Sequence, residues 1–338
     1  MEVKRPQDDS LVRLPPVLRR LDTIDVDRPA IQALHVIERL AARAIYPSSD
    51  IAAVRRRYAE SRKPLLAPLE PVDSIVRIHP PGREAPPLAV IRPSGFQPGE
   101  RLPAIVYLHG GGWTVGSLET YEPLCRQLAN ALNAVIVWVE YRLAPEHPFP
   151  AAYDDARTAF QWVQQNHAGL GIDPARIGIG GDSSGGNLAA AACLAAQGQP
   201  GSAKPWIQLL LYPCLDLTAC MDSHKEFAEG FLLTAELYRW YRRNYVQNHE
   251  KPGHWRLSPL FAHDVSGLPP AVILYAGFDP LRDEAAAYAG RLREAGVPVE
   301  TLFFRDMIHG FLNMGGAIPA ARAAVHRIAQ AVEMLTEA

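Results

Sequence analysis

Short apolar runs alternate with longer helical stretches along most of the chain, and this alternation limits the fold more than any other feature. Eight runs rich in branched and aromatic side chains predict β-strands: residues 74–79, 88–92, 104–110, 134–140, 176–181, 206–212, 271–277 and 299–304. From the third run onward, helical stretches separate most of them, and their continuous apolarity suits a parallel sheet covered on both faces. The first two runs are expected to pair as a hairpin at one edge. The sequence therefore predicts an α/β fold with a mostly parallel central sheet.

Composition narrows the class of protein. With 338 residues, of which 48% are apolar and 21% charged, the chain can bury one large core and carry an insertion. A net charge of −2 gives no reason to expect nucleic acid as a partner. No apolar run approaches the roughly 20 residues of a transmembrane helix, and the first residues lack the apolar core of a signal peptide. Four cysteines show no metal-ligand spacing: Cys125, Cys193, Cys214 and Cys220. We expect a cytoplasmic protein with free thiols and no metal site.

A glycine-rich turn with two adjacent serines joins a predicted strand to a predicted helix. The five residues fit the pattern G-x-S-x-G: Gly181, Asp182, Ser183, Ser184 and Gly185. A side chain two positions before or after the central serine would crowd this strained junction, and a frame centred on Ser184 would put Asp182 there. Ser183 is therefore the candidate nucleophile, and the backbone N–H of Ser184 is a candidate oxyanion donor. Taken alone, the pattern is also compatible with a plain glycine-rich turn.

The stretch HGGGW at residues 109–113 follows another predicted strand. Consecutive glycines let bare backbone N–H groups approach a reacting carbonyl oxygen, which is the second half of an oxyanion hole. Gly111 and Gly112 are the candidate donors, whereas His109 is expected to bond the loop rather than act as a base. Two matches at the ends of two different strands favour a catalytic site over a chance turn.

A serine hydroxyl becomes a good nucleophile only when a base takes its proton and a carboxylate orients that base. These groups are expected in the chain order Ser, Asp, His. Asp279 lies at a predicted strand end and is the candidate acid, whereas Asp283 lies at the next helix start and is interpreted as structural. Only His309 and His326 follow Asp279 in the chain. His309, in a loop beside a glycine, is the candidate base.

Two helical regions depart from the strand and helix alternation. Residues before 63 and residues 214–256 both carry apolar positions at helical spacing, so we expect them to form a lid over the carboxyl edge of the sheet. The second region has an apolar face for which two interpretations stay open, packing between helices or lining a pocket: Leu237, Trp240, Tyr241 and Tyr245. The basic triplet at residues 55–57 is interpreted as a solvated helix face.

In order and spacing, the motifs resemble those of the hormone-sensitive lipase family of α/β-hydrolase carboxylesterases. The motifs that carry the resemblance are HGGGW, YRLAPEHPFPAAYDD, GDSSGGNLA, YP, DPLRDE and HGF, between about residues 102 and 311. The resemblance implies the α/β-hydrolase fold and an oxyanion hole formed by Gly111, Gly112 and Ser184. It also implies a catalytic domain over residues 63–338, with cap segments at 1–62 and 214–256. Ser184 stands where alanine is commoner, which leaves its backbone role unchanged.

The activity implied by this resemblance is that of a serine carboxylesterase. Short to medium acyl-chain carboxylic esters would be cleaved through an acyl-enzyme intermediate by Ser183, Asp279 and His309, without a metal or other cofactor. An amidase or peptidase with the same triad, and a non-catalytic receptor on this scaffold, are the alternatives; the intact triad counts against the receptor. The expected partner is a small-molecule ester. The sequence does not distinguish a monomer from a homodimer.

Overall fold

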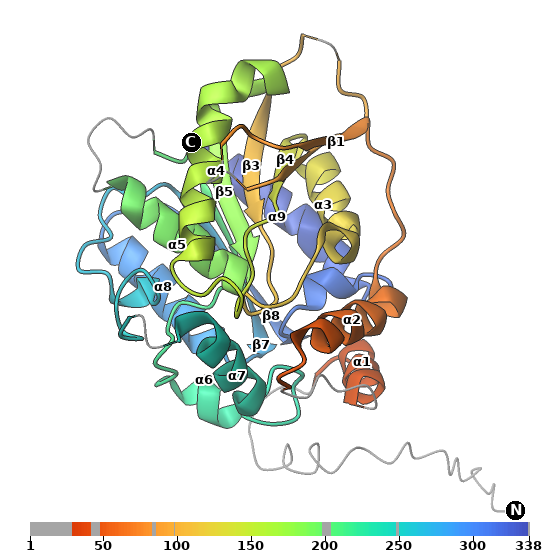
Figure 1. Ribbon diagram of the computed structural model, residues 1–338, viewed down its shortest axis with the longest axis vertical. Helices are drawn as coiled ribbons and strands as arrows, with labels where there is room; N and C mark the ends of the chain where they lie inside the picture. Colours follow the sequence, from red (N-terminus) through yellow and green to blue (C-terminus); the bar gives the residue numbers. More distant parts are fainter. Residues whose placement is uncertain are drawn as a thin grey trace, which may run out of the picture.

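The computed structural model describes residues 29–41, 48–82, 86–97, 99–197, 204–247 and 250–336 (Figure 1). Of the predicted N-terminal cap segment, residues 1–28 and 42–47 lie outside this description. None of the helices in the described ranges is long and apolar enough to span a lipid bilayer.

One eight-stranded sheet forms the centre of the molecule, in the order β1-β2-β4-β3-β5-β6-β7-β8 (Figure 1). Its strands are β1 (Ser74–Ile78), β2 (Leu88–Arg92), β3 (Leu102–Leu108), β4 (Val135–Val139), β5 (Ile172–Asp182), β6 (Gln208–Leu211), β7 (Ala271–Phe278) and β8 (Val299–Ile308). Strand β2 runs antiparallel to both its neighbours and the other pairs are parallel. The predicted α/β class, the eight strands and the edge hairpin are thus confirmed.

Strands β5 and β8 are longer than the runs predicted from the sequence. Strand β8 continues past residue 304 because it stays paired with β7 through a register shift, with Phe278 opposite Ile308. This added part begins with two exposed polar residues, Arg305 and Asp306, before the buried Met307 and Ile308. The polar pair hid the end of the strand from a search for apolar runs. The longer strand carries residue 309 to the sheet edge at which β7 also ends.

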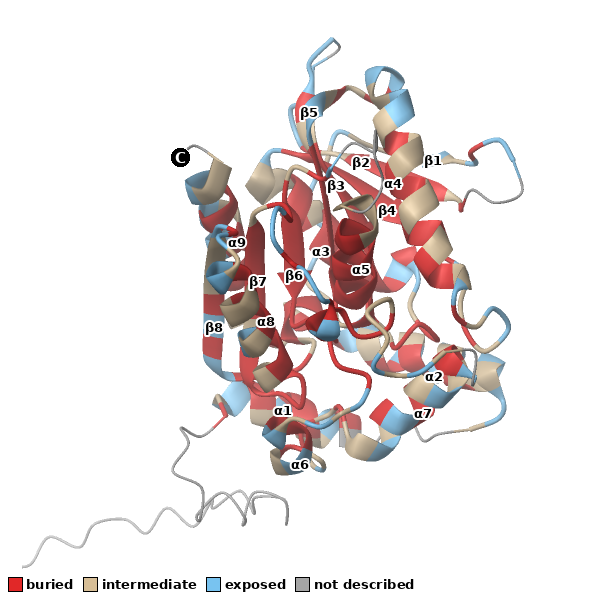
Figure 2. Ribbon diagram, turned by 90° about the vertical axis from the view of Figure 1, so that its left-hand side faces the viewer, coloured by how far each residue is buried: buried red, intermediate tan, exposed pale blue. Residues whose placement is uncertain are grey.

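Helices cover both faces of the sheet, as predicted from its apolar strands. α3 (Leu118–Leu132) and α9 (Ala320–Thr336) pack on one face, and α4 (Ala151–Leu170), α5 (Ser184–Gln197) and α8 (Arg282–Glu294) on the other (Figures 1 and 2). Because side chains alternate along a strand, Ile105 joins the apolar cluster of α3 and α9 while Val106 joins that of α4 and α5. Short 3-10 helices complete the elements: η2 (Lys63–Leu65), η3 (Pro259–Phe261) and η4 (Phe311–Met314).

Four helices gather beyond the carboxyl ends of the parallel strands (Figures 1 and 2). They are α1 (Ile31–Ala41) and α2 (Ile51–Arg62) from the N-terminal region, and α6 (Asp222–Glu226) and α7 (Ala235–Val246) from the region after β6. Capping side chains start two of them: Asp50 accepts from Ala53 N, and Thr234 accepts from Leu237 N. Helices α2 and α7 share a small apolar cluster with the loop after β3. Both off-pattern regions therefore meet over the same sheet edge.

The interpretation of the basic triplet as a solvated face is wrong for Arg55. Its guanidinium donates to the carbonyl oxygens of Thr114 (2.9 Å) and Ala144 (3.1 Å) and forms a two-pronged ion pair with Glu146. Arg56 and Arg57 are exposed. Arg55 therefore fastens α2 to two loops of the sheet domain.

We predict that Arg55→Met lowers the melting temperature by about 2 to 4 °C. The two hydrogen bonds to backbone carbonyls contribute about 1 to 2 kcal/mol, and the half-exposed ion pair adds little because water screens it. Arg56→Met, on the solvent side of the same helix, is the matched control. Differential scanning calorimetry that finds equal melting temperatures for the two variants would contradict the role of Arg55.

Candidate active site

Ser183 occupies a sharp turn between β5 and α5. Its φ of +54° lies in the left-handed region, which is unfavourable for a serine. A Cβ at Gly181 or at Gly185 would overlap the carbonyl oxygen of Leu108 at the end of β3. Glycine at both positions thus lets β5 and α5 approach β3, as expected for the frame centred on Ser183. Backbone bonds hold the turn, from Ser183 N to Leu211 O (2.9 Å) and from Cys214 N to Ser183 O (3.0 Å).

His309 lies between Ser183 and Asp279. Its Nε2 is 2.9 Å from Ser183 Oγ, and its Nδ1 is 2.7 Å from Asp279 Oδ2. Asp279 is fully buried, and its other carboxylate oxygen accepts from Leu281 N at 2.8 Å. With Nδ1–H donating to the carboxylate, Nε2 is left to accept the serine proton. The three residues selected from the sequence are therefore in contact, in the order nucleophile, base and acid.

The rival candidates lie elsewhere. Asp283 accepts hydrogen bonds from Ser223 N (2.9 Å) and from the guanidinium of Arg282 (2.8 Å), which agrees with a structural role. His326 is exposed on α9. His109 is buried under the glycine loop, with Nδ1 at 2.7 Å from Gly110 O, and burial lowers its pKa to about 4. It is consequently neutral and holds the loop.

Gly111 and Gly112 pass close to other groups and have positive φ angles, +114° and +58°. A Cβ at Gly111 would meet the Val115 carbonyl, and one at Gly112 would meet the ring of Tyr241 from α7. None of the hydrogen bonds formed by described residues uses the N–H of Gly111, Gly112 or Ser184. These N–H groups remain available to an oxygen bound beside Ser183.

The side chain of Ser184 has a contact that the sequence did not predict. Its hydroxyl accepts from Trp113 N at 3.2 Å and is buried. This bond ties the turn after β5 to the glycine loop after β3. The presence of serine where alanine is commoner was the available signal, because a buried hydroxyl needs a partner.

Asp182 was also missed as a functional candidate. Its buried carboxylate accepts from Gly110 N (2.8 Å), Tyr107 OH (3.0 Å) and Tyr121 OH (3.1 Å). Burial raises the pKa of Asp182 to about 6, although these three donors oppose the rise. Asp182 therefore anchors the glycine loop from the residue adjacent to Ser183. A carboxylate at the end of an apolar strand was the signal in the sequence.

A cavity of about 410 Å³ opens onto Ser183 and His309. Side chains of α1, α2 and α7 form much of its wall: Ile37, Leu40, Tyr58, Leu237, Tyr238 and Tyr241. The apolar face of α7 therefore both lines a pocket and packs between helices. Leu237 and Tyr241 line the cavity, whereas the ring of Tyr245 stacks on that of Trp113, with ring centroids 4.3 Å apart. Nowhere in the described ranges do three or more His, Cys, Asp or Glu side chains group as ligands for a metal ion.

Comparison with known proteins agrees with this geometry. A family model described as alpha/beta hydrolase fold matches residues 105–313. The carboxylic ester hydrolase LipN of Mycobacterium tuberculosis is 45% identical over 66% of this chain, which spans 60% of LipN's length. Esterase LipI of the same organism is 36% identical over 91% of this chain and 96% of its own. A solved hyperthermophilic esterase from the archaeon Pyrobaculum calidifontis has a TM-score of 0.84 and 39% identity, covering 92% of this chain and 100% of its own. The chain belongs to the hormone-sensitive lipase family of α/β-hydrolase carboxylesterases.

Proposed function

We propose that this protein is a serine carboxylesterase in which Ser183 is the nucleophile, His309 the base and Asp279 the acid. The observation that carries the proposal is the unbroken contact from Ser183 Oγ through the imidazole to a buried carboxylate, at 2.9 Å and 2.7 Å. The names of its relatives, carboxylic ester hydrolase and esterase, support the same reaction. No specific contact favours an amide over an ester substrate.

The mechanism follows from the geometry. Ser183 Oγ attacks the ester carbonyl carbon while its proton passes to His309 Nε2, and the buried Asp279 stabilises the imidazolium that forms. The N–H groups of Gly111, Gly112 and Ser184 hold the negative oxygen of the tetrahedral intermediate. Collapse of that intermediate breaks the C–O bond, and His309 protonates the leaving alcohol. Water then cleaves the acyl-enzyme by the same route. Each proton moves between groups of this chain, the substrate and water.

The substrate is proposed to be a small ester with a short to medium acyl chain. A cavity of about 410 Å³ with a mainly aliphatic and aromatic wall fits such a molecule. Residues 1–62 and 214–256 are proposed as the two cap segments of a catalytic domain that covers residues 63–338. A cytoplasmic location stays a prediction, with which the four free thiols are consistent.

The adjacent serines test the nucleophile assignment. Ser183→Ala should abolish the hydrolysis of p-nitrophenyl butyrate. Ser184→Ala should keep its backbone donor and lose only about fivefold in kcat, because Trp113 N–H is left without its acceptor. Steady-state rates of both purified variants decide the matter. An active Ser183→Ala enzyme would refute the proposed function.

The two neighbouring aspartates test the acid. Asp279→Asn should lower kcat by up to about 10⁴-fold, because an amide opposite Nδ1 favours the wrong imidazole tautomer. Asp283→Asn serves as the control and should affect the melting temperature more than turnover. If the larger loss of kcat follows Asp283→Asn in folded protein, the acid is assigned wrongly.

Leu237 tests the cap's contribution to the cavity wall. Leu237→Trp should reduce kcat/KM for p-nitrophenyl octanoate about tenfold relative to the acetate, because the indole takes up room that a longer chain needs. Arg239→Trp adds the same group to the exposed side of α7 and should leave the chain-length profile unchanged. Equal profiles for both variants would show that α7 does not shape the pocket.

A further inference from the structure

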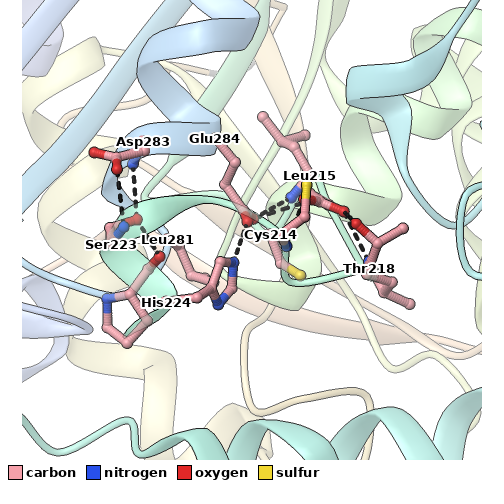
Figure 3. Close-up of polar contacts among 12 residues, drawn as sticks. Cys214, Leu215, Thr218, Ser223, His224, Leu281, Asp283 and Glu284 are labelled. Atoms are coloured by element: carbon pink, nitrogen blue, oxygen red, sulfur yellow. Dashed lines mark hydrogen bonds and ion pairs between the residues drawn. The ribbon is translucent and has the colours of Figure 1, made fainter. Parts of the chain in front are cut away.

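Glu284 is a fully buried carboxylate that contacts two other parts of the chain, the loop after β6 and helix α6 (Figure 3). It lies in the first turn of α8, shortly after the loop that bears Asp279. Its Oε1 accepts from Leu215 N (2.6 Å), and its Oε2 is 2.8 Å from Nε2 of His224 in α6. The exposed fraction of the side chain is 0% for Glu284 and 7% for His224. The mechanism proposed above gives this buried pair no task.

On one side, the pair holds α6 against the loop of the acid. Ser223, which precedes His224, donates from Oγ to Pro280 O (2.6 Å) and from N to Asp283 (2.9 Å). Figure 3 shows the bond between Ser223 and Asp283 beside the contact between His224 and Glu284. Because Pro280 directly follows Asp279, the docking of α6 fixes the backbone that aims the acid at His309.

On the other side, the pair supports the nucleophile turn and the cavity wall. Leu215 follows Cys214, whose N–H donates to the carbonyl oxygen of Ser183 at 3.0 Å. Tyr238 of α7 lines the cavity, donates to Asp216 O (2.8 Å) and has its ring 5.2 Å from that of His224. One carboxylate thus joins the supports of the acid, the nucleophile and the cap.

The surroundings of the pair are acidic. Asp216 and Asp279 act on His224 from the loops after β6 and β7, and the thiol of Cys214 and the phenol of Tyr238 lie close by. Among the described side chains, His224 is the one cationic group that pairs with Glu284, because Arg282 pairs with Asp283 and Glu226 instead. An imidazole facing several carboxylates favours its protonated form.

Both members of the pair hold protons more tightly when folded. Burial raises the pKa of Glu284 to about 7, against the opposing effect of His224. Burial alone would lower the pKa of His224, but the hydrogen bond and charge of Glu284 outweigh it and raise that pKa. Both folded values therefore exceed the unfolded ones, so the stability that the pair contributes falls as pH rises through neutral.

We propose that Glu284 and His224 are positioning residues for ester hydrolysis. The two side chains share one proton, and their contact holds α6, the Asp279 loop and the Ser183 turn in fixed relative positions. This inference rests on the proposed function. When the shared proton leaves, Glu284 becomes an uncompensated buried anion beside Asp216 and Asp279. Opening α6 to water relieves that charge and releases Pro280, so turnover decreases on the alkaline side.

The experiment compares the pH profiles of the wild type and Glu284→Gln. The amide carbonyl accepts from Leu215 N and the NH₂ donates to a neutral His224, so both hydrogen bonds remain while the shared proton is lost. Titrating the acid released from ethyl butyrate at constant pH gives kcat from about pH 6 to about pH 10. We expect an alkaline decrease of up to about tenfold per pH unit in the wild type and a plateau in the variant. The same alkaline decrease in both would overturn the proposal.

Two further variants make the test specific. Glu226→Gln removes another carboxylate between α6 and α8, whose partner is an arginine that stays charged, and should keep the wild-type alkaline decrease. Glu284→Leu leaves Leu215 N and His224 without partners and should lower kcat about tenfold with a smaller change in KM. Normal kcat in folded Glu284→Leu would overturn the positioning role. Failure of the proposed function is separate, since it would appear as activity in Ser183→Ala at every pH.

Discussion

The close approach of three backbone segments is the constraint on which the rest of the site depends. Gly181 and Gly185 both pack on the carbonyl of Leu108, so β5 and α5 approach the end of β3 within a distance that excludes any side chain. The serine turn and the glycine loop are thereby held at one point. The proposed oxyanion donors Gly111 and Gly112 line the same cavity as Ser183, and their position beside it depends on this contact. The positive φ of Ser183 is sustained by the surrounding packing.

Buried carboxylates then join the loops that leave the sheet. Asp182, Asp279 and Glu284 are each fully buried or nearly so, and each accepts hydrogen bonds from a segment distant in sequence. A buried carboxylate without partners is costly, so each one selects the loop arrangement that satisfies it. Asp182 fixes the position of the glycine loop, Asp279 fixes the imidazole of His309, and Glu284 fixes the segment after β6. These buried hydrogen bonds thus hold in place loops that have few apolar residues to pack.

The contacts that the sequence predicted and those that it missed differ in how far apart the partners lie along the chain. The strands, the glycine contacts around Ser183 and the contact of Asp279 rather than Asp283 with His309 could be predicted from neighbouring residues. Arg55 meets Thr114 across 59 residues, Trp113 meets Ser184 across 71, and His224 meets Glu284 across 60. Such partners are defined only by the fold. The serine at position 184 indicated that a partner exists, but neither it nor the lone Arg or Glu indicated which residue the partner is. The end of β8 was missed because two exposed polar residues, Arg305 and Asp306, interrupt its apolar residues.

The proposed cap segments contact the loops that carry the proposed catalytic residues. Arg55 of α2 binds the carbonyl of Thr114, the ring of Tyr241 from α7 lies against Gly112, and Ser223 of α6 binds Pro280. Each of these contacts ends on backbone within a few residues of a proposed oxyanion donor or of the proposed acid. A change in cap position therefore alters the alignment of the reacting groups as well as the shape of the cavity. Substitutions selected for a new substrate in α2, α6 or α7 are for this reason expected to change kcat together with KM, whereas those confined to the cavity face of α1 should act mainly on KM.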